Sequence, residues 1–202
     1  MNRFANFLLA GFLAVLSQMA LAERPMPPRQ PVEKLNAALI EVMKDAKRLG
    51  YAGRYKKLEP VVKEVFQFQA IAQVALGTYW NKLDESQRQA FVAKLTDLSI
   101  ATYASQFSAY DGQTFRYDAT EDTKPDRAIV RYAMLAPKDD KAIKFEYIVN
   151  RSGPNWRIVN VVVDGISDLA LKKAQYTSIM DREGFDALLA KLSQKIADYA
   201  KK

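Results

Sequence analysis

The sequence contains neither cysteine nor histidine among its 202 residues. Without cysteine the chain has no disulfide, no thiol nucleophile and no thiolate metal ligand. Without histidine it lacks the most common zinc ligand and the base that activates serine or cysteine nucleophiles. An enzyme built on this chain would have to work with carboxylates, lysines and tyrosines. These absences favour a binding protein over an enzyme, and they predict that no cofactor and no metal is used.

Long apolar runs are also scarce, and the one present lies at the N-terminus. Phe4 to Leu16 carries no charge, follows the basic start Met1-Asn2-Arg3, and precedes the small-residue site Ala20-Leu21-Ala22. At about a dozen residues the run is shorter than the roughly 20 that a membrane-spanning helix needs. The pattern predicts a signal peptide over residues 1–22, cleaved after Ala22. With no cysteine to carry a lipid anchor, we expect the exported chain to be soluble.

The charge balance is basic, with a formal net charge of +7. This balance favours anionic partners, which for an exported chain means lipid headgroups or acidic proteins. No run of lysine and arginine with interleaved aromatics is present, so nucleic acid is not expected as a partner. Lys56-Lys57 and Lys172-Lys173 are interpreted as solvated faces that could also meet an anionic lipid.

Helical periodicity covers most of the chain outside its centre. Residues 23–31 hold four prolines and predict an extended leader, followed by a single domain over 32–202. Asp84 with Gln87 three residues later has the spacing of a capping box at the start of the longest helix. Apolar residues at helical spacing predict helices over 32–50, 55–66, 67–77, 84–110 and 168–182, and a last one from 185.

The central third of the chain changes to strand periodicity. Stretches rich in valine, isoleucine and aromatics, separated by turn residues, predict four strands over 114–118, 127–136, 142–150 and 155–163. Short connections between them imply antiparallel hairpins. Helices before and after such a block predict an α+β fold with a four-stranded antiparallel sheet.

Strand alternation then predicts one strongly apolar face on the sheet. If the turns are symmetric, odd-numbered residues meet odd-numbered residues, which adds Ile129, Ala133 and Leu135 to this face. The long helix would cover it. The face is expected either to fill an ordinary solid core or to line a cavity for acyl chains, and the sequence patterns fit both. Its members are Phe145, Tyr147, Val149, Val159, Val161 and Val163, with Tyr103 and Phe107 from the helix.

Several motifs resemble the MlaC family of periplasmic phospholipid-binding proteins, also called toluene-tolerance proteins. They include Leu76-Gly77-Thr78-Tyr79-Trp80, Thr102-Tyr103-Ala104, the stretch GPNWRIVNVVVDGIS from Gly153 to Ser167, and QYTSI from Gln175 to Ile179. The likeness extends over residues 32–196. It departs at Asn160, where the family usually has aspartate, so that any inherited polar contact there is open. Tyr176 stands where phenylalanine is common.

Within the family the chain looks most similar to the hopanoid-associated branch, known as HpnM. This similarity rests on two segments, YAGRYKKL from Tyr51 to Leu58 and GISDLA from Gly165 to Ala170. The ligand is therefore expected to be a membrane lipid, either a phospholipid or a hopanoid.

The resemblance implies a curved sheet of the nuclear-transport-factor-2-like class, wrapped by helices that enclose acyl chains. It implies a monomeric periplasmic carrier that moves lipid between outer and inner membranes, with the headgroup near the mouth of the cavity. The implied partners are an inner-membrane MCE-type transporter and an outer-membrane lipoprotein complex. The eight aromatic and valine residues of the predicted apolar face would bind the lipid.

Two other functions remain open at this point. Folds of this broad class also host small isomerases and dehydratases that use aspartate and tyrosine in an apolar pocket. Asp118, Tyr103, Tyr132 and Tyr147 could supply such groups. Alternatively, the chain could be a lipid-free adaptor of a membrane transport complex.

Overall fold

The computed structural model describes residues 26–137 and 141–201. The predicted signal peptide, the start of the leader and three residues of the turn after Pro137 lie outside these ranges. Within the described ranges, no helix is both long and apolar enough to cross a membrane.

The first two helices differ from the predicted pair in where they divide. The helices are α1 (Gln30–Lys44) and α2 (Ala46–Val65). Helix α1 begins two residues before the predicted domain boundary, and Pro31 lies in its first turn, where a missing N–H costs nothing. The predicted break at Gly50 is a kink inside α2 instead. Gly50 has φ 58° and ψ −175°, a conformation that favours glycine.

The next elements follow the predicted order closely. They are α3 (Phe68–Leu76), the 3-10 helix η1 (Gly77–Lys82) and α4 (Glu85–Gln106). The predicted capping box is present: the Gln87 backbone N–H donates to Asp84, and the Asp84 backbone N–H donates to the Gln87 side chain. Helix α4 ends at Gln106, earlier than predicted, because the backbone of Phe107 leaves the helical region.

Five antiparallel strands form one sheet in the order β1-β2-β3-β4-β5. The predicted α+β class is confirmed, with one strand more than predicted. The strands are β1 (Thr114–Lys124), β2 (Arg127–Leu135), β3 (Ile143–Ser152), β4 (Asn155–Val163) and β5 (Ile166–Ser167). The fifth has only two residues, too few for any periodic pattern in the sequence to indicate.

The strand register corrects the predicted composition of the apolar face. Between β2 and β3, Val130 pairs with Tyr147 and Tyr132 pairs with Phe145, so even-numbered residues of β2 meet odd-numbered residues of β3. The turn is therefore not symmetric, and the expectation for Ile129, Ala133 and Leu135 is wrong. A shift of one residue moves every side chain of a strand to the opposite face. The even-numbered residues of β2, such as Val130 and Tyr132, therefore lie on the apolar face in place of the odd-numbered ones.

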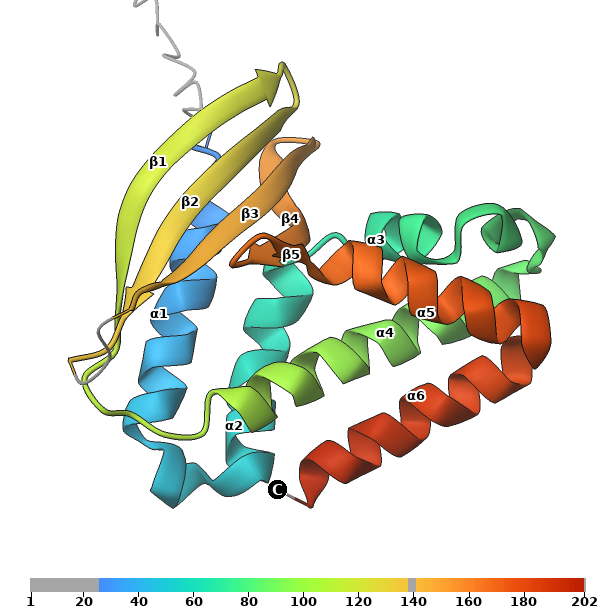
Figure 1. The fold of residues 1–202 in the computed structure, drawn as a ribbon, viewed down its shortest axis with the longest axis horizontal. Helices are drawn as coiled ribbons and strands as arrows, with labels where there is room; N and C mark the ends of the chain where they lie inside the picture. Colours follow the sequence, from blue (N-terminus) through green and yellow to red (C-terminus); the bar gives the residue numbers. More distant parts are fainter. Residues whose placement is uncertain (1–25, 138–140, 202) are drawn as a thin grey trace, which may run out of the picture.

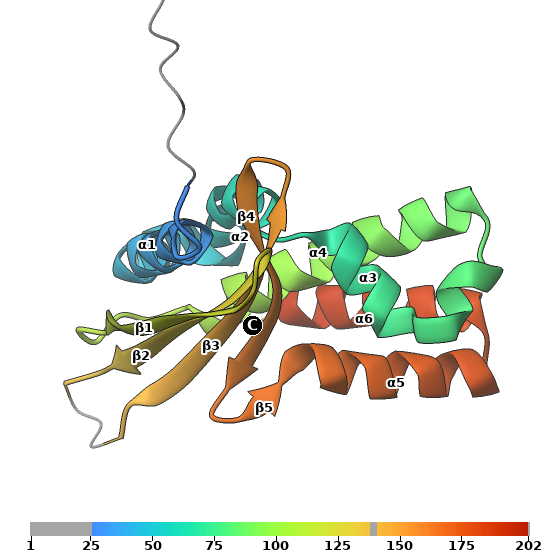
Figure 2. The same cartoon turned by 90° about the horizontal axis from the view of Figure 1, so that it is seen from above.

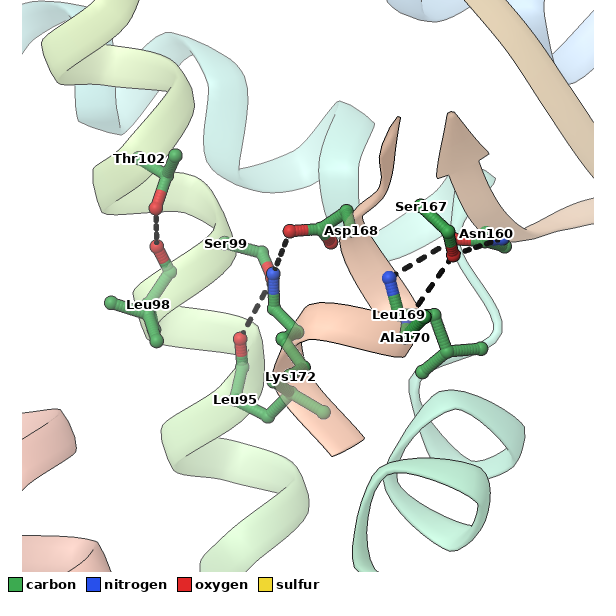
Figure 3. A network of polar contacts seen from close by, with 10 residues as sticks. All are labelled: Leu95, Leu98, Ser99, Thr102, Asn160, Ser167, Asp168, Leu169, Ala170 and Lys172. Atoms are coloured by element: carbon green, nitrogen blue, oxygen red, sulfur yellow. Dashed lines mark hydrogen bonds and ion pairs between the residues drawn. The ribbon is translucent and has the colours of Figure 1, made fainter. Parts of the chain in front are cut away.

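The chain leaves the sheet through β5 and enters α5 (Asp168–Arg182), followed by α6 (Phe185–Ala200). Asn160 holds this junction together (Figure 3). Its side-chain amide donates to the Ser167 hydroxyl at 3.0 Å, and its oxygen accepts from the Leu169 backbone N–H at 3.1 Å. The Ser167 hydroxyl in turn accepts from the Ala170 backbone N–H, as an N-cap does. The sequence left open whether the residue at position 160 makes a polar contact when it is asparagine instead of the usual aspartate. In the structure Asn160 makes such contacts.

The helices meet the sheet unevenly. Helices α1, α2, α3 and α5 all pack against β4, and the remaining helix contacts are mostly with other helices. Figures 1 and 2 show α1 running along one face of the curved sheet, while α3 to α6 gather beyond β4 and β5. The sheet therefore has a helix-packed end at β4 and a freer end at β1 and β2.

Candidate functional site

Five aromatic side chains form a continuous surface on the sheet face that α1 covers. Neighbouring rings have centroid separations of 5.5 to 6.4 Å, and most of the pairs meet edge to face. Such pairs combine a large apolar area with a preferred geometry. The residues are Phe115, Tyr117, Tyr132, Phe145 and Tyr147, from β1, β2 and β3.

Most of the predicted strand residues share this face. Phe145 pairs with Val163, and Tyr147 pairs with Val161, across β3 and β4. Tyr147 and Val161 are buried, whereas Phe145 and Val163 keep partial exposure. The predicted set is therefore brought together at this end of the two strands.

A β-bulge changes the other end of the same pair of strands. Val149 pairs with Ile158, and Val159 is the extra residue of the bulge. Beyond this point even-numbered residues of β4, such as Trp156, share the face with odd-numbered residues of β3. Val159 is buried but lies outside the main hydrophobic cluster, which contains Val149 and Ile158. Regular alternation predicts Val159 on the aromatic face. Because the bulge inserts one residue into β4, Val159 does not lie on that face.

The two predicted residues of α4 belong to a second aromatic group. The Tyr103 ring lies 6.0 Å from Phe66 and 5.9 Å from Phe107, measured between centroids. Burial is the main cause that raises the pKa of the Tyr103 phenol, with a smaller contribution from Asp168. Burial is also the main cause that raises the pKa of the Tyr147 phenol, with smaller contributions from Tyr103 and Tyr132. Tyr103 is half-buried and packs, with Phe107, against the main hydrophobic cluster.

An open groove of about 510 Å³ runs between α1 and the aromatic face. Its size falls within the roughly 300–1,000 Å³ typical of ligand sites. The sheet contributes two aromatic rings to its wall, and α1 contributes a mixed apolar and charged wall. The lining residues are Glu33, Asn36, Ala37, Ile40, Glu41, Lys44, Phe115 and Tyr132.

The charged residues that line the groove are exposed and interact with other side chains. Glu33 forms an ion pair with Arg29 at 3.2 Å, and Glu41 accepts from Lys57 at 2.6 Å. The Lys44 ammonium lies 5.4 Å from the centre of the Tyr110 ring. The groove thus combines apolar and aromatic residues with two carboxylates and one ammonium group.

None of the residues that line this groove was predicted to bind lipid, although the sequence carries a signal for two of them, Asn36 and Tyr132. Asn36 is a polar residue among the inward positions Val32, Leu35 and Leu39 of α1, and it is 4% exposed. The Tyr147 hydroxyl donates to its side-chain oxygen at 3.0 Å. Tyr132 was assigned to the opposite face because of the register error.

Two other grooves lie elsewhere on the described surface. One of about 430 Å³ lies between α2, α4 and α6, and one of about 400 Å³ lies between the leader and the β1–β2 turn. The predicted lipid-binding residues line none of these three grooves. The groove beside α1 is the one that adjoins the aromatic face.

Chemistry-bearing groups do not converge as the enzymatic interpretation requires. Asp118 is the extra residue of a bulge in β1, is exposed, and accepts from Arg116 at 2.9 Å. It is not in the buried group of tyrosines that the same interpretation invoked. Within the described residues, no cluster of three or more acidic side chains is placed to hold a metal ion.

The fold is shared with a protein of known ligand. A solved structure of the phospholipid-binding protein from Ralstonia solanacearum, in complex with a phospholipid, superposes with a TM-score of 0.72. The two sequences are 20% identical, and the match covers 87% of this chain and 99% of that one. At this level of identity the likeness establishes the fold: an antiparallel curved sheet with helices, as in that protein.

The family follows from the sequence itself. Residues 33–194 match the family model described as MlaC protein. This match spans most of the chain, which therefore belongs to the MlaC family. The resemblance noted from the motifs is confirmed at the level of the family.

Proposed function

We propose that this chain is a periplasmic carrier that holds membrane lipid with its acyl chains between the sheet and the helices. The observation that carries the proposal is the aromatic face of β1 to β3, with an open groove between it and α1. Membership of the MlaC family and the fold shared with a phospholipid-binding protein support the same conclusion.

Hydrophobic transfer supplies enough free energy for such a carrier. Each buried methylene is worth about 0.8 kcal/mol, so a chain of about fourteen methylenes gains roughly 11 kcal/mol before the costs of binding. Binding of this kind needs no cofactor and little polar recognition. It fits a site where aromatic and aliphatic residues make up half of the lining and the charged residues are exposed.

A cation in the groove lining suggests how the lipid is oriented. Lys44 lines the groove and meets the Tyr110 ring, and Arg29 lies 5.6 Å from the centre of the Tyr117 ring. Lys44, which lines the groove, would face an anionic headgroup while the acyl chains turn inward; Arg29 lies at the other end of α1, roughly 22 Å away along the helix. Because Lys44 remains near solvent, it would contribute little selectivity among headgroups.

The proposed function includes export to the periplasm and exchange of lipid with complexes in both membranes. The chain would be exported with its signal peptide removed, act as a monomer, and exchange lipid with an inner-membrane MCE-type transporter and an outer-membrane lipoprotein complex. Its likeness to the HpnM branch makes a hopanoid the alternative cargo to a phospholipid. A lipid-free adaptor and a small isomerase or dehydratase are the competing functions.

Solvent extraction of the purified protein separates these functions. The full-length chain is expressed in a Gram-negative host, purified from the periplasm, and extracted with organic solvent. A carrier yields lipid in amounts comparable to the protein. Protein without lipid that turns over a small carbonyl compound would identify an enzyme. Protein with neither lipid nor turnover would identify an adaptor. Hopanoid is tested by supplying it together with phospholipid and comparing the recovered amounts.

A further inference from the structure

One polar group lies at the groove without a partner. The Asn36 side chain is 4% exposed, and its oxygen accepts the hydrogen bond from Tyr147. Its amide nitrogen, Nδ2, is buried and makes no hydrogen bond to any of the described residues. An unpaired buried donor costs about 1–3 kcal/mol, so such groups are rare without a functional reason.

The two carboxylates that line the groove are directed toward cations and not toward this amide. Glu33 and Glu41 line the same groove, but each is ion-paired, with Arg29 and Lys57 respectively. From the sheet, Phe115 and Tyr132 line the groove, and Nδ2 donates to neither of them. A ligand that fills the groove can supply the acceptor that Nδ2 lacks among the described residues.

The required partner is a hydrogen-bond acceptor attached to an apolar body. An ester carbonyl oxygen of an acylated lipid has this chemistry, because it lies where the headgroup region joins the hydrocarbon chains. A purely hydrocarbon skeleton has no acceptor at the corresponding depth. Tyr147 holds the other end of the Asn36 amide, so that the donor is oriented before the ligand binds.

We propose that Asn36 Nδ2 donates a hydrogen bond to an ester carbonyl oxygen of the bound lipid and so selects ester-linked acyl lipids. This inference rests on the proposed lipid-carrier function and names the lipid class that the site favours. Asn36 acts as a specificity-determining residue, while the aromatic face supplies most of the binding free energy.

Matched ester and ether phospholipids test the proposal. The two lipids have the same headgroup and chain lengths, and only the ester form has the carbonyl oxygen. Delipidated protein is titrated with each by competition against a fluorescent lipid. A net hydrogen bond is worth about 0.5–1.5 kcal/mol, so we expect the wild-type protein to prefer the ester lipid by about fivefold.

Substitution of Asn36 should abolish that preference. Asn36→Leu removes the donor, and Asn36→Asp removes it while keeping an acceptor for Tyr147. Both variants are expected to bind the ester and ether lipids equally. Asn155→Leu, at the start of β4 and away from the groove lining, is the matched control and should keep the wild-type ratio. Circular dichroism identifies which of the two Asn36 variants is folded, and the ratio is read from that one.

The outcomes separate this inference from the proposed function. Equal affinity of the wild-type protein for both lipids, or a preserved preference in the folded Asn36 variant, would overturn the role of Asn36 and leave the carrier intact. Failure of the wild-type protein to bind either lipid would overturn both.

Discussion

Tyrosine hydroxyls and one amide provide the polarity of an otherwise apolar face. Burial is the main cause that raises the pKa of Tyr132 to about 12, and burial raises the pKa of Tyr147 well above its usual value. Both phenols are therefore neutral at physiological pH. A neutral wall with a few hydroxyls can contact acyl chains without the cost of burying a charge.

The raised tyrosine pKa values predict a loss of stability in alkali. Tyrosines in the unfolded chain ionise near pH 10, while Tyr55 and Tyr132 in the folded chain ionise near 12. Between these values the unfolded state binds fewer protons, so the free energy of unfolding falls as pH rises above about 10. Thermal melts across this range should show a falling midpoint, with a shallower fall in Tyr132→Phe. A midpoint that stays level or rises would contradict the assignment.

A charge placed on the groove wall should remove the lipid. Phe115 is half-buried, lines the groove and contacts Phe145. In Phe115→Asp a carboxylate would face acyl chain with no hydrogen-bond partner, at a cost of a few kcal/mol. We expect a folded protein that retains less than about a tenth of the wild-type lipid, measured by solvent extraction beside circular dichroism.

The matched control places the same charge on an apolar residue elsewhere. Leu171 lies on α5 and is 60% exposed, and it does not line the groove. Leu171→Asp should keep full lipid occupancy. If Phe115→Asp also keeps it while folded, the lipid lies elsewhere. Phe115 is a better test than Tyr147, because Tyr147 is 1% exposed and a carboxylate there would disrupt the core.

At the scale of single residues, the sequence predicted part of one sheet face and none of the residues that line the groove beside it. The odd-numbered residues Phe145, Tyr147, Val161 and Val163 do share one face, as alternation requires. Val159 does not, because a bulge inserts one residue that no periodic pattern reveals. Whether these residues contact lipid stays a prediction.

Among the elements, the junction between β4 and α5 depends on a few side-chain hydrogen bonds. The Asn160 oxygen accepts from Leu169, and the Ser167 hydroxyl accepts from Ala170, so two N–H groups of the first helical turn are satisfied (Figure 3). Unsatisfied N–H groups at a helix start are costly, which explains why polar residues stand on both sides of this turn.

Substitutions at this junction should separate hydrogen bonding from charge. Ser167→Ala is expected to cost about 1 kcal/mol of stability, the usual value for a lost N-cap. Asn160→Leu loses both of its contacts and should cost about 1–3 kcal/mol. Asn160→Asp keeps an acceptor for Leu169 and for the Ser167 hydroxyl, so we expect a change below about 0.5 kcal/mol. Urea denaturation measures all three; an aspartate variant as unstable as the leucine variant would contradict the account.

Local signals explain which element boundaries were predictable. The start of α4 carries a capping box, and the sequence placed it correctly. The break near Gly50 has a signal as well, but glycine marks a kink there instead of the end of a helix. Strand β1 extends to Lys124 through charged residues that lack alternation, because it is stabilised by pairing with β2. Tertiary pairing of this kind overrides local pattern.

At the scale of the whole molecule, the β4 end of the sheet is packed with helices and the β1–β2 end is less covered. The core includes the helices together with Tyr132 and Tyr147 of the aromatic face, and the open groove lies where α1 passes Phe115 and Tyr132. The sequence predicted the order of the elements, the fold class and the family. It could not separate a solid core from a cavity, because both require the same apolar residues; that distinction depends on how far α1 stands from the sheet.

Native mass spectrometry tests the central claim most directly. Full-length protein is expressed in a Gram-negative host, purified from the periplasm without detergent, and sprayed under conditions that preserve noncovalent complexes. We predict a monomer starting at Glu23 that carries additional mass equal to one or more ester-linked lipids, released as intact lipid on collisional activation. A population consisting only of the bare polypeptide mass, from protein that is folded by circular dichroism, would contradict the proposal that this chain carries lipid.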